Sequence, residues 1–263
     1  MGRLGLWAIR LWSYAVFFFL VAPLVVLVGA SFASEGYVQF PPRDLSLTWY
    51  REFLRDATFV RAILLSGQLA LASAVLATII GFLASYVLVR KRFVGRRIIW
   101  SLLLSPLILP QIVLGVALLQ FFTMLGAANT FVGLLCAHVV SVLPYVIRTV
   151  GAALLTVDVR IEEAAADLGA NTLVTLGFVV APMVKGAMIA AGLFAFIMSW
   201  INVEISIFLS STGLYPLPVV LYNFMEYSIT TLVVAAAAIG IYVAVALVVL
   251  VDVTIGLHRA TRI

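Results

Sequence analysis

The sequence predicts an all-α integral membrane protein with six transmembrane helices in a single domain, residues 1–263. The chain is 65% hydrophobic and only 10% charged, whereas soluble domains are roughly 45 to 50% apolar and about 25% charged. Its mean hydropathy is +1.22, and several apolar runs reach about 20 residues, enough to cross roughly 30 Å of hydrocarbon. Helices are expected because an open sheet would leave backbone groups unpaired in lipid.

Six apolar stretches mark the predicted spans. They cover residues 11–33, 60–89, 98–121, 130–155, 185–210 and 231–257. The first follows Arg3 and Arg10, as a secretory signal would, but it exceeds the roughly 7 to 15 apolar residues of a signal sequence, so we interpret it as a retained anchor. Proline removes a helix hydrogen bond, so Pro106 and Pro110 should bend the third span and Pro144 the fourth.

Basic residues predict the orientation of these spans. Segment 90–97 carries five Lys and Arg and no acid, and cytoplasmic loops are enriched in such residues. We therefore expect this segment and both termini to be cytoplasmic, together with 12 of the 16 basic residues. These are Arg3, Arg10, Arg90, Lys91, Arg92, Arg96, Arg97, Arg148, Arg160, Lys185, Arg259 and Arg262. An anionic-lipid site in segment 90–97 is an alternative to plain charge sorting.

The longest predicted cytoplasmic piece is residues 156–184. From Thr156 the chain reads TVDVRIEEAAADLGANTLVTLGFVVAPMVKG. Asp158 is placed to cap the start of a short helix, and Gly169 is placed as the left-handed residue that ends it. A second helix is expected after this glycine turn, with an interruption at Pro182.

One face of the short helix is apolar and sterically small. Ile161, Ala165 and Leu168 lie at helical spacing in a stripe too short to span a membrane. The successive alanines 164–166 would let another surface approach closely. Two interpretations remain open from the residues alone: the helix docks as a knob in a socket of another protein, or it is a connector on the lipid interface.

The same segment resembles the EAA signature of permease subunits of binding-protein-dependent ABC importers. The matching residues are Glu163, Ala164, Ala165, Gly169, Val179, Ala181 and Pro182. Three residues separate Ala165 from Gly169, and nine separate Gly169 from Val179. Ala181 departs from the signature, which prefers Leu there.

The resemblance extends over about residues 60–258. It includes the runs SPLILPQIVLG, AHVVSVLPYVIRTV and SWINVEISIFLSS, and it is to the second permease of spermidine and putrescine importers and their relatives for aminophosphonates and opines. It implies a type I ABC importer permease (MetI-like) fold in a bacterial inner membrane and import of a small polar organic solute: a polyamine, aminophosphonate, opine or similar. Ile201 and Asn202 depart from the acidic residues that polyamine permeases tend to carry there.

The resemblance also implies a mechanism with separate partners. The residues expected to couple to an ABC ATPase dimer are Glu162, Glu163, Ala164, Ala165, Leu168, Gly169 and Pro182. ATP and Mg²⁺ are expected on that partner, because this chain has no GxxxxGK[ST] phosphate-binding loop. We expect no enzymatic activity or cofactor on this chain. The other implied partners are a second permease, either a paralogue or a copy of this chain, a periplasmic solute-binding protein and membrane lipid, but no nucleic acid.

Asn202, Glu204 and Ser206 are the candidate translocation-pathway residues. Glu204 lies well within an apolar span, where a charge is costly unless it faces a cavity or partner; a structural hydrogen bond is the alternative. In a helix, Asn202 and Ser206 would share a face and Glu204 would point elsewhere. His138, near Ser141, is interpreted as a packed histidine that a neighbouring helix satisfies rather than as a proton relay.

Two other functions compete with the importer subunit. An intramembrane enzyme is disfavoured because the two histidines, His138 and His258, lie on different segments and the chain has neither HExxH nor a GxSxG serine motif. A secondary transporter that works alone also places a few polar groups among apolar helices. It remains the alternative, although no internal repeat is evident and the EAA segment argues against it.

Overall fold

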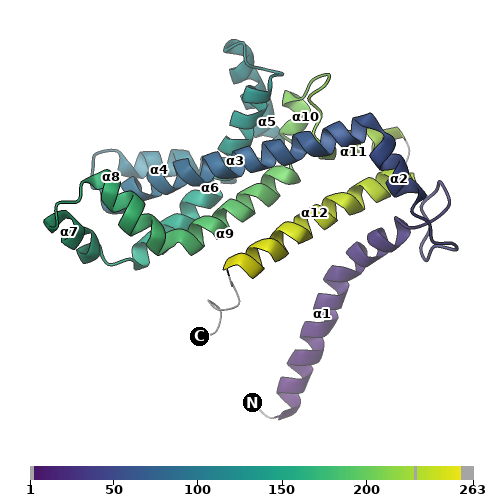
Figure 1. The fold of residues 1–263 in the computed structure, drawn as a ribbon, viewed down its shortest axis with the longest axis horizontal. Helices are drawn as coiled ribbons and strands as arrows, with labels where there is room; N and C mark the ends of the chain where they lie inside the picture. The colour runs from purple at the N-terminus through teal and green to yellow at the C-terminus, as the bar shows by residue number, and fades with distance from the viewer. Residues whose placement is uncertain (1–2, 228–229, 256–263) are drawn as a thin grey trace. The chain divides into compact units, whose positions relative to one another are not determined.

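A computed structural model describes residues 3–227 and 230–255, which form helices joined by turns and loops, the longest between α1 and α2 (Figure 1). Predictions that involve His258, Arg259 and Arg262 lie outside the described residues. The helices are α1 (Arg3–Ala30), α2 (Thr48–Arg55), α3 (Ala57–Arg90), α4 (Arg96–Leu104), α5 (Gln111–Met124), α6 (Phe131–Thr156), α7 (Val159–Asp167), α8 (Thr172–Thr175), α9 (Ala181–Trp200), α10 (Ser206–Leu209), α11 (Leu217–Tyr227) and α12 (Thr231–Ile255). A 3-10 turn, Ser105–Leu107, follows α4, and a π turn, Leu176–Val180, precedes α9.

The described residues contain five helical runs long and apolar enough to cross a membrane. They are Ile9–Ala30, Ala57–Arg90, Phe131–Thr156, Thr172–Trp200 and Thr231–Leu250. A sixth span results if the bent pair Arg96–Leu107 and Gln111–Met124 is taken as one crossing. The prediction of an all-helical, multi-pass membrane protein is therefore confirmed, with five or six spans by length and composition.

The third predicted span is a corner rather than a continuous helix. Its two halves meet at an angle of 111°, with Pro106 in the 3-10 turn and Pro110 immediately before α5. Proline has no N–H to continue the helical hydrogen bonds, which is the physical reason for the break. The bend expected from these two prolines is confirmed, whereas α6 continues through Pro144.

The predicted fifth span, residues 185–210, is wrong at both ends. The helical run begins at Thr172, inside the piece predicted to be cytoplasmic, and α9 ends at Trp200. The expected interruption at Pro182 is present as a change of helix type rather than as a break in the helical run. The π turn Leu176–Val180 lies just before this proline, and the changed hydrogen-bond spacing of a π turn accommodates a residue that cannot donate.

The contacts divide the chain into two compact units: unit 1 is residues 1–61 and 220–245, and unit 2 is residues 62–219 and 246–263. The single domain over 1–263 stays a prediction. Within unit 1, the Tyr50 hydroxyl lies 3.2 Å from that of Tyr242, and Phe59 packs against Phe224. The apolar window of α1 is 0% buried, so this helix leaves its surface for lipid or another chain.

Unit 2 is built on close packing of α3, α6 and α9. At Gly81 of α3, a Cβ would lie 2.6 Å from Cγ1 of Val146 on α6, so only glycine permits this crossing. Ser85 Oγ donates to the Ile147 carbonyl oxygen at 3.1 Å across the same pair. A buried apolar cluster joins α3, α5, α6 and α10 and includes Leu69, Leu114, Phe122, Leu134, Ala137, Ile205 and Leu209. The two candidate sites described next also lie in unit 2.

Candidate functional site

Helix α7 is capped at both ends as the sequence predicts. The Asp158 side chain accepts a hydrogen bond from the Arg160 N–H at 3.0 Å. Gly169 has a φ of +89°, its N–H donates to Ala166 O at 2.8 Å, and the Ala170 N–H donates to Ala165 O at 3.0 Å. This pair of bonds is a Schellman motif, in which a left-handed residue satisfies the last carbonyls of a helix.

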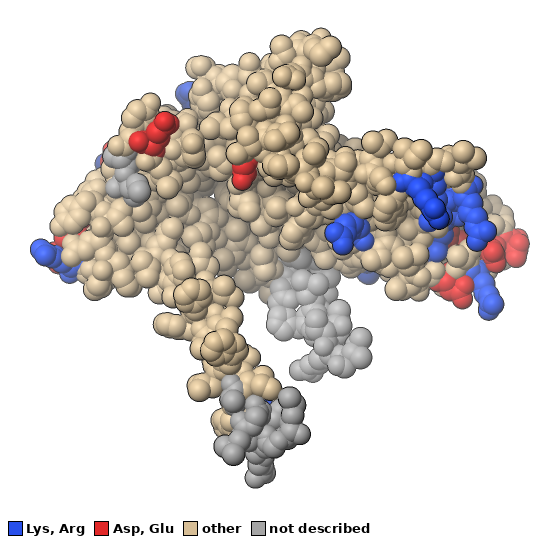
Figure 2. Space-filling view, turned by 180° about the vertical axis from the view of Figure 1, so that it is seen from behind, with Lys and Arg blue, Asp and Glu red and all other residues tan. Residues whose placement is uncertain are grey.

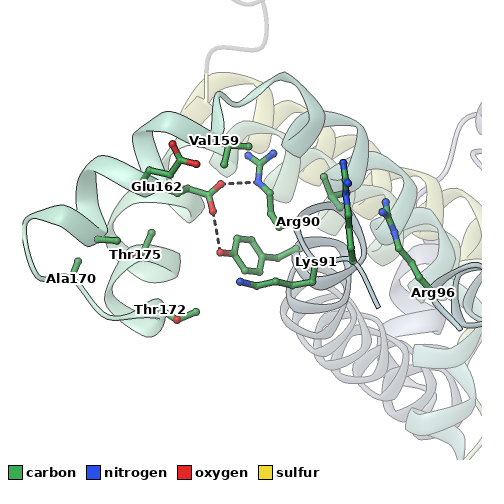
Figure 3. Close-up of a pocket in the computed structure, with 13 residues that line it drawn as sticks. Arg90, Lys91, Arg96, Val159, Glu162, Ala170, Thr172 and Thr175 are labelled. Carbon is green, nitrogen blue, oxygen red and sulfur yellow. Dashed lines mark hydrogen bonds and ion pairs between the residues drawn. The ribbon is translucent and has the colours of Figure 1, made fainter. Parts of the chain in front are cut away.

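One side chain ties α7 to α3. Glu162 Oε1 accepts from Arg90 Nε at 2.7 Å, and its Oε2 accepts from the Tyr86 hydroxyl at 3.0 Å (Figure 3). Arg90 Nη2 also donates to Val157 O at 2.9 Å. The two charged side chains are only 9% and 10% exposed. Such a shielded, multiply bonded pair holds α7 in one position more firmly than a solvent-exposed pair would.

Elsewhere the segment exposes large apolar side chains. Leu168 is 90% exposed, and Leu173 and Phe178, which were not predicted as site residues, are 79% and 80% exposed. These large apolar side chains have no cover in the described residues, and exposed apolar area of this kind is typical of an interaction site. Their apolar character in a predicted cytoplasmic segment was a signal that could have identified them.

The predicted coupling residues therefore do not share one environment. Glu163, Ala164, Gly169 and Pro182 are exposed with Leu168, and Ala165 is half-buried. Glu162 alone turns its charged end toward α3, as Figure 3 shows. A pocket of about 480 Å³ separates α7 from the basic segment and is lined by Arg90, Lys91, Arg92 and Arg96 among others. In Figure 2, Lys and Arg gather toward this end of unit 2.

A second, smaller pocket lies among the spanning helices. Its volume is about 160 Å³, and its lining is Gln111, Ser141, Val142, Tyr145, Met198, Ile201, Asn202 and Glu204. Asn202 is buried and Glu204 is exposed. The expectation that Glu204 points away from Asn202 is wrong, because it assumed a continuous helix and the chain is not helical from Asn202 to Ile205. Once the helix ends, alternating residues can face the same cavity.

Ser206 is absent from this lining and instead belongs to a buried polar cluster. His138 is fully buried, with Nδ1 2.7 Å from Ser199 Oγ and Nε2 2.9 Å from Ser206 Oγ. The prediction of a packed histidine satisfied by a neighbouring helix is confirmed, since Ser199 lies on α9. The described residues contain no group of three or more side chains suited to hold a metal ion.

Comparison with known proteins places these features in a family. No protein-family model matches the chain. The chain is 34% identical over 237 residues to a spermidine/putrescine transport system permease protein of Haemophilus influenzae, covering 90% of this chain and 92% of that protein. It is 35% identical over 214 residues to a putrescine transport system permease protein of Escherichia coli strain K12, covering 79% and 76% of the two chains.

Solved structures agree on the fold. One chain of a bacterial ABC transporter that imports the acidic polysaccharide alginate superposes with a TM-score of 0.73 at 18% identity, covering 97% of this chain and 98% of that one. A chain of the MetNI methionine ABC transporter gives 0.60 at 18% identity, covering 73% and 92%. The sequence relatives and the fold lead to the same conclusion: the chain belongs to the family of spermidine/putrescine-type permease subunits of binding-protein-dependent ABC importers.

Proposed function

We propose that α7 and the turn after it form the coupling surface by which an ABC ATPase dimer drives this permease. The observation that carries the proposal is the two-sided character of the segment. Its Glu162 side binds α3 through Arg90 and Tyr86, and its outer side exposes Leu168, Leu173 and Phe178. A segment that is anchored to a spanning helix and also offers an apolar contact surface can transmit a movement of a bound partner to that helix.

The full assembly follows from this proposal. We propose six spans in a type I (MetI-like) arrangement, with the corner between α4 and α5 as part of one crossing, in a bacterial inner membrane with both termini cytoplasmic. A second permease, paralogous or identical, completes the pathway and contacts the uncovered α1. A periplasmic solute-binding protein delivers the cargo, and ATP with Mg²⁺ binds only to the ATPase dimer.

The 160 Å³ pocket is the proposed part of the translocation pathway on this chain. Glu204 is an exposed acid among apolar helices, and such a charge is stable only beside water, a partner or a cation. One carboxylate with the amide of Asn202 and the hydroxyl of Tyr145 suits a small organic cation that carries an ammonium group. We therefore propose a polyamine-class cargo, as in the relatives, with the acid at position 204 in place of acids at 201 and 202.

The test is ATP hydrolysis by the complete complex in lipid nanodiscs. The permease is co-purified with its cognate ATPase, partner permease and binding protein, and stimulation by putrescine, spermidine and 2-aminoethylphosphonate is compared. Glu163→Ala and Gly169→Asp are expected to abolish stimulation, because they alter the outward surface and its turn. Glu204→Gln is expected to weaken the response to the amines while leaving basal hydrolysis unchanged.

The outcomes separate the two parts of the proposal. Normal ATPase association and stimulation in both α7 variants would exclude α7 as the coupling surface and place the contact with the ATPase elsewhere on the chain. Stimulation by the aminophosphonate but not by the amines would replace the polyamine-class cargo. An unchanged amine response in Glu204→Gln would remove this acid from the pathway.

A further inference from the structure

We propose that His138 is a positioning residue for transport, because its ring bridges the two ends of the break between α9 and α10 and so fixes the pathway loop, residues 201–205. This loop carries Asn202 and Glu204 into the transmembrane pocket. The proposal rests on the proposed pathway role of that pocket. His138 itself does not line the pocket. By fixing the loop it would determine where Asn202 and Glu204, which do line it, are placed.

The geometry of the bridge is specific to the break. Ser199 lies in the last turn of α9, and Ser206 is the first residue of α10. Their hydroxyl oxygens lie 2.7 Å and 2.9 Å from the two nitrogens of the one His138 ring. In an uninterrupted helix, residues seven apart would be separated by about 10.5 Å along the axis. Both can reach one imidazole here because the helix ends at Trp200.

The proton positions follow from the neighbouring bonds. Ser206 Oγ donates its only proton to the carbonyl oxygen of Asn202 at 2.7 Å, so it must accept from His138. Nε2–H is therefore the donor, and Nδ1 accepts from the Ser199 hydroxyl. A neutral ring in this tautomer satisfies both serines, which a phenylalanine of similar size could not do.

The chain of bonds ends on Asn202 itself. Its backbone oxygen accepts from Ser206, and its Oδ1 accepts from the Ile205 N–H at 3.0 Å. Both oxygens are thus used within the loop, and no bond in the described part of the chain uses the side-chain NH₂, which stays available beside the pocket. On its other side the loop meets α5, where a Cβ at Gly115 would lie 3.0 Å from Glu204 O. The loop is therefore held by α5 on one side and by His138, through Ser206, on the other.

The first measurement needs no knowledge of the cargo. In a Cys136→Ser background, Val203→Cys places a thiol in the middle of the loop, and its rate of maleimide labelling reports how firmly the loop is held. His138→Phe and Ser206→Ala are expected to increase this rate several-fold, and His138→Gln, which keeps one amide donor, to increase it less. Ser85→Ala is the matched control, because Ser85 is equally buried and donates to a backbone oxygen away from the loop.

The second measurement is putrescine uptake by the assembled complex in proteoliposomes. Ser206→Ala is expected to raise KM about tenfold, the effect of one lost hydrogen bond at a positioned group, with little change in basal ATP hydrolysis. Glu204→Gln and Asn202→Ala are measured beside it. Because Ser206→Ala removes one oxygen atom only, it tests the proposal even where His138→Phe fails to assemble.

The failures are distinguishable. Labelling rates in His138→Phe and Ser206→Ala equal to those in Ser85→Ala would overturn the positioning role. If the KM of Ser206→Ala stays normal while Glu204→Gln and Asn202→Ala raise theirs, the pathway stands and the role of His138 falls. If all these variants keep a normal KM, the pathway proposal itself is wrong. Where the wild type does not take up putrescine, the labelling rates alone decide.

Discussion

Two adjacent acids on α7 have different surroundings, so substitutions at them should distinguish an effect on stability from an effect on coupling to the ATPase. Glu162 is bound to Arg90 and Tyr86, whereas Glu163 is exposed. Glu162→Ala should lower the free energy of unfolding by about 3 kcal/mol, because it leaves a shielded guanidinium without its carboxylate. Thermal unfolding of the purified chain in detergent measures the change.

Glu163→Ala is the matched control for that prediction. It should leave the unfolding temperature unchanged and still impair stimulated ATP hydrolysis. A similar loss of stability in both variants would mean that the ion pair with Arg90 contributes no more than an ordinary surface charge.

Single residues were predictable where the cause is local. Asp158 and Gly169 could be assigned from the sequence because a cap and a left-handed turn depend on residues a few positions away. The inward turn of Glu162 could not, because its partner Arg90 lies 72 residues earlier. The same holds for His138, whose burial was expected but whose two serine partners depend on where α9 ends.

Among the elements, α7 depends on the turn that ends it. Gly169 has a φ of +89°, a conformation that costs an L-residue with a side chain about 1 to 2 kcal/mol. Gly169→Ala should therefore fray the end of α7 and reduce stimulated ATP hydrolysis several-fold. Gly186→Ala is the control in α9, where a Cβ would meet nothing within 4 Å and alanine should favour the helix. Equal activity in both variants would show that the turn is not required.

The crossing of α3 over α6 makes a second prediction for the elements. A methyl group at Gly81 would overlap Val146, so Gly81→Ala should destabilise unit 2 by about 1 to 3 kcal/mol. Val146→Ala removes Cγ1, the nearest overlapping atom, and should restore part of this loss in the double variant; the Cβ at position 146, 2.9 Å away, remains. Unfolding temperatures of the wild type, both single variants and the double variant measure the coupling; strictly additive losses would contradict the close approach.

Element positions were predictable where apolar length alone decides them. The prediction for α6 was residues 130–155, close to the observed Phe131–Thr156. The start of the fifth span was not found, because residues 172–184 follow a cytoplasmic signature and include Pro182. The π turn that lets the helix continue past this proline depends on packing, since Leu176 and Val180 are buried.

For the whole molecule, the proposed orientation predicts where added thiols react. In a Cys136→Ser background, Val94→Cys, at a fully exposed position in the basic segment, should react with a membrane-impermeant maleimide only after the membrane is opened. Leu45→Cys, 78% exposed in the segment before α2, should react in intact cells. The reverse pattern would invert the assignment of both termini. Both positions are well exposed, so access across the membrane rather than burial decides the result.

The overall architecture was predictable because lipid permits few alternatives. Apolar length marked six stretches, five of which correspond to single helical runs in the described residues, and the chain shares its fold with solved ABC importer permeases. The bend in the third span was expected from its prolines, but its sharpness, 111°, and the division into two compact units were not foreseen. The division into units depends on contacts between distant segments, which composition and periodicity do not report.

The corner between α4 and α5 affects how deeply water can reach into the membrane-spanning part of the protein. The first N–H groups of a helix have no acceptor within it, and those of α5 follow Pro110 at a sharp turn inside an apolar stretch. Hydrocarbon offers them no acceptor, so another subunit or water must do so. Hydrogen–deuterium exchange should therefore be fast at Ile112 and Val113 and slow in the middle of α6, which would mark a water-filled indentation reaching deep into the bilayer.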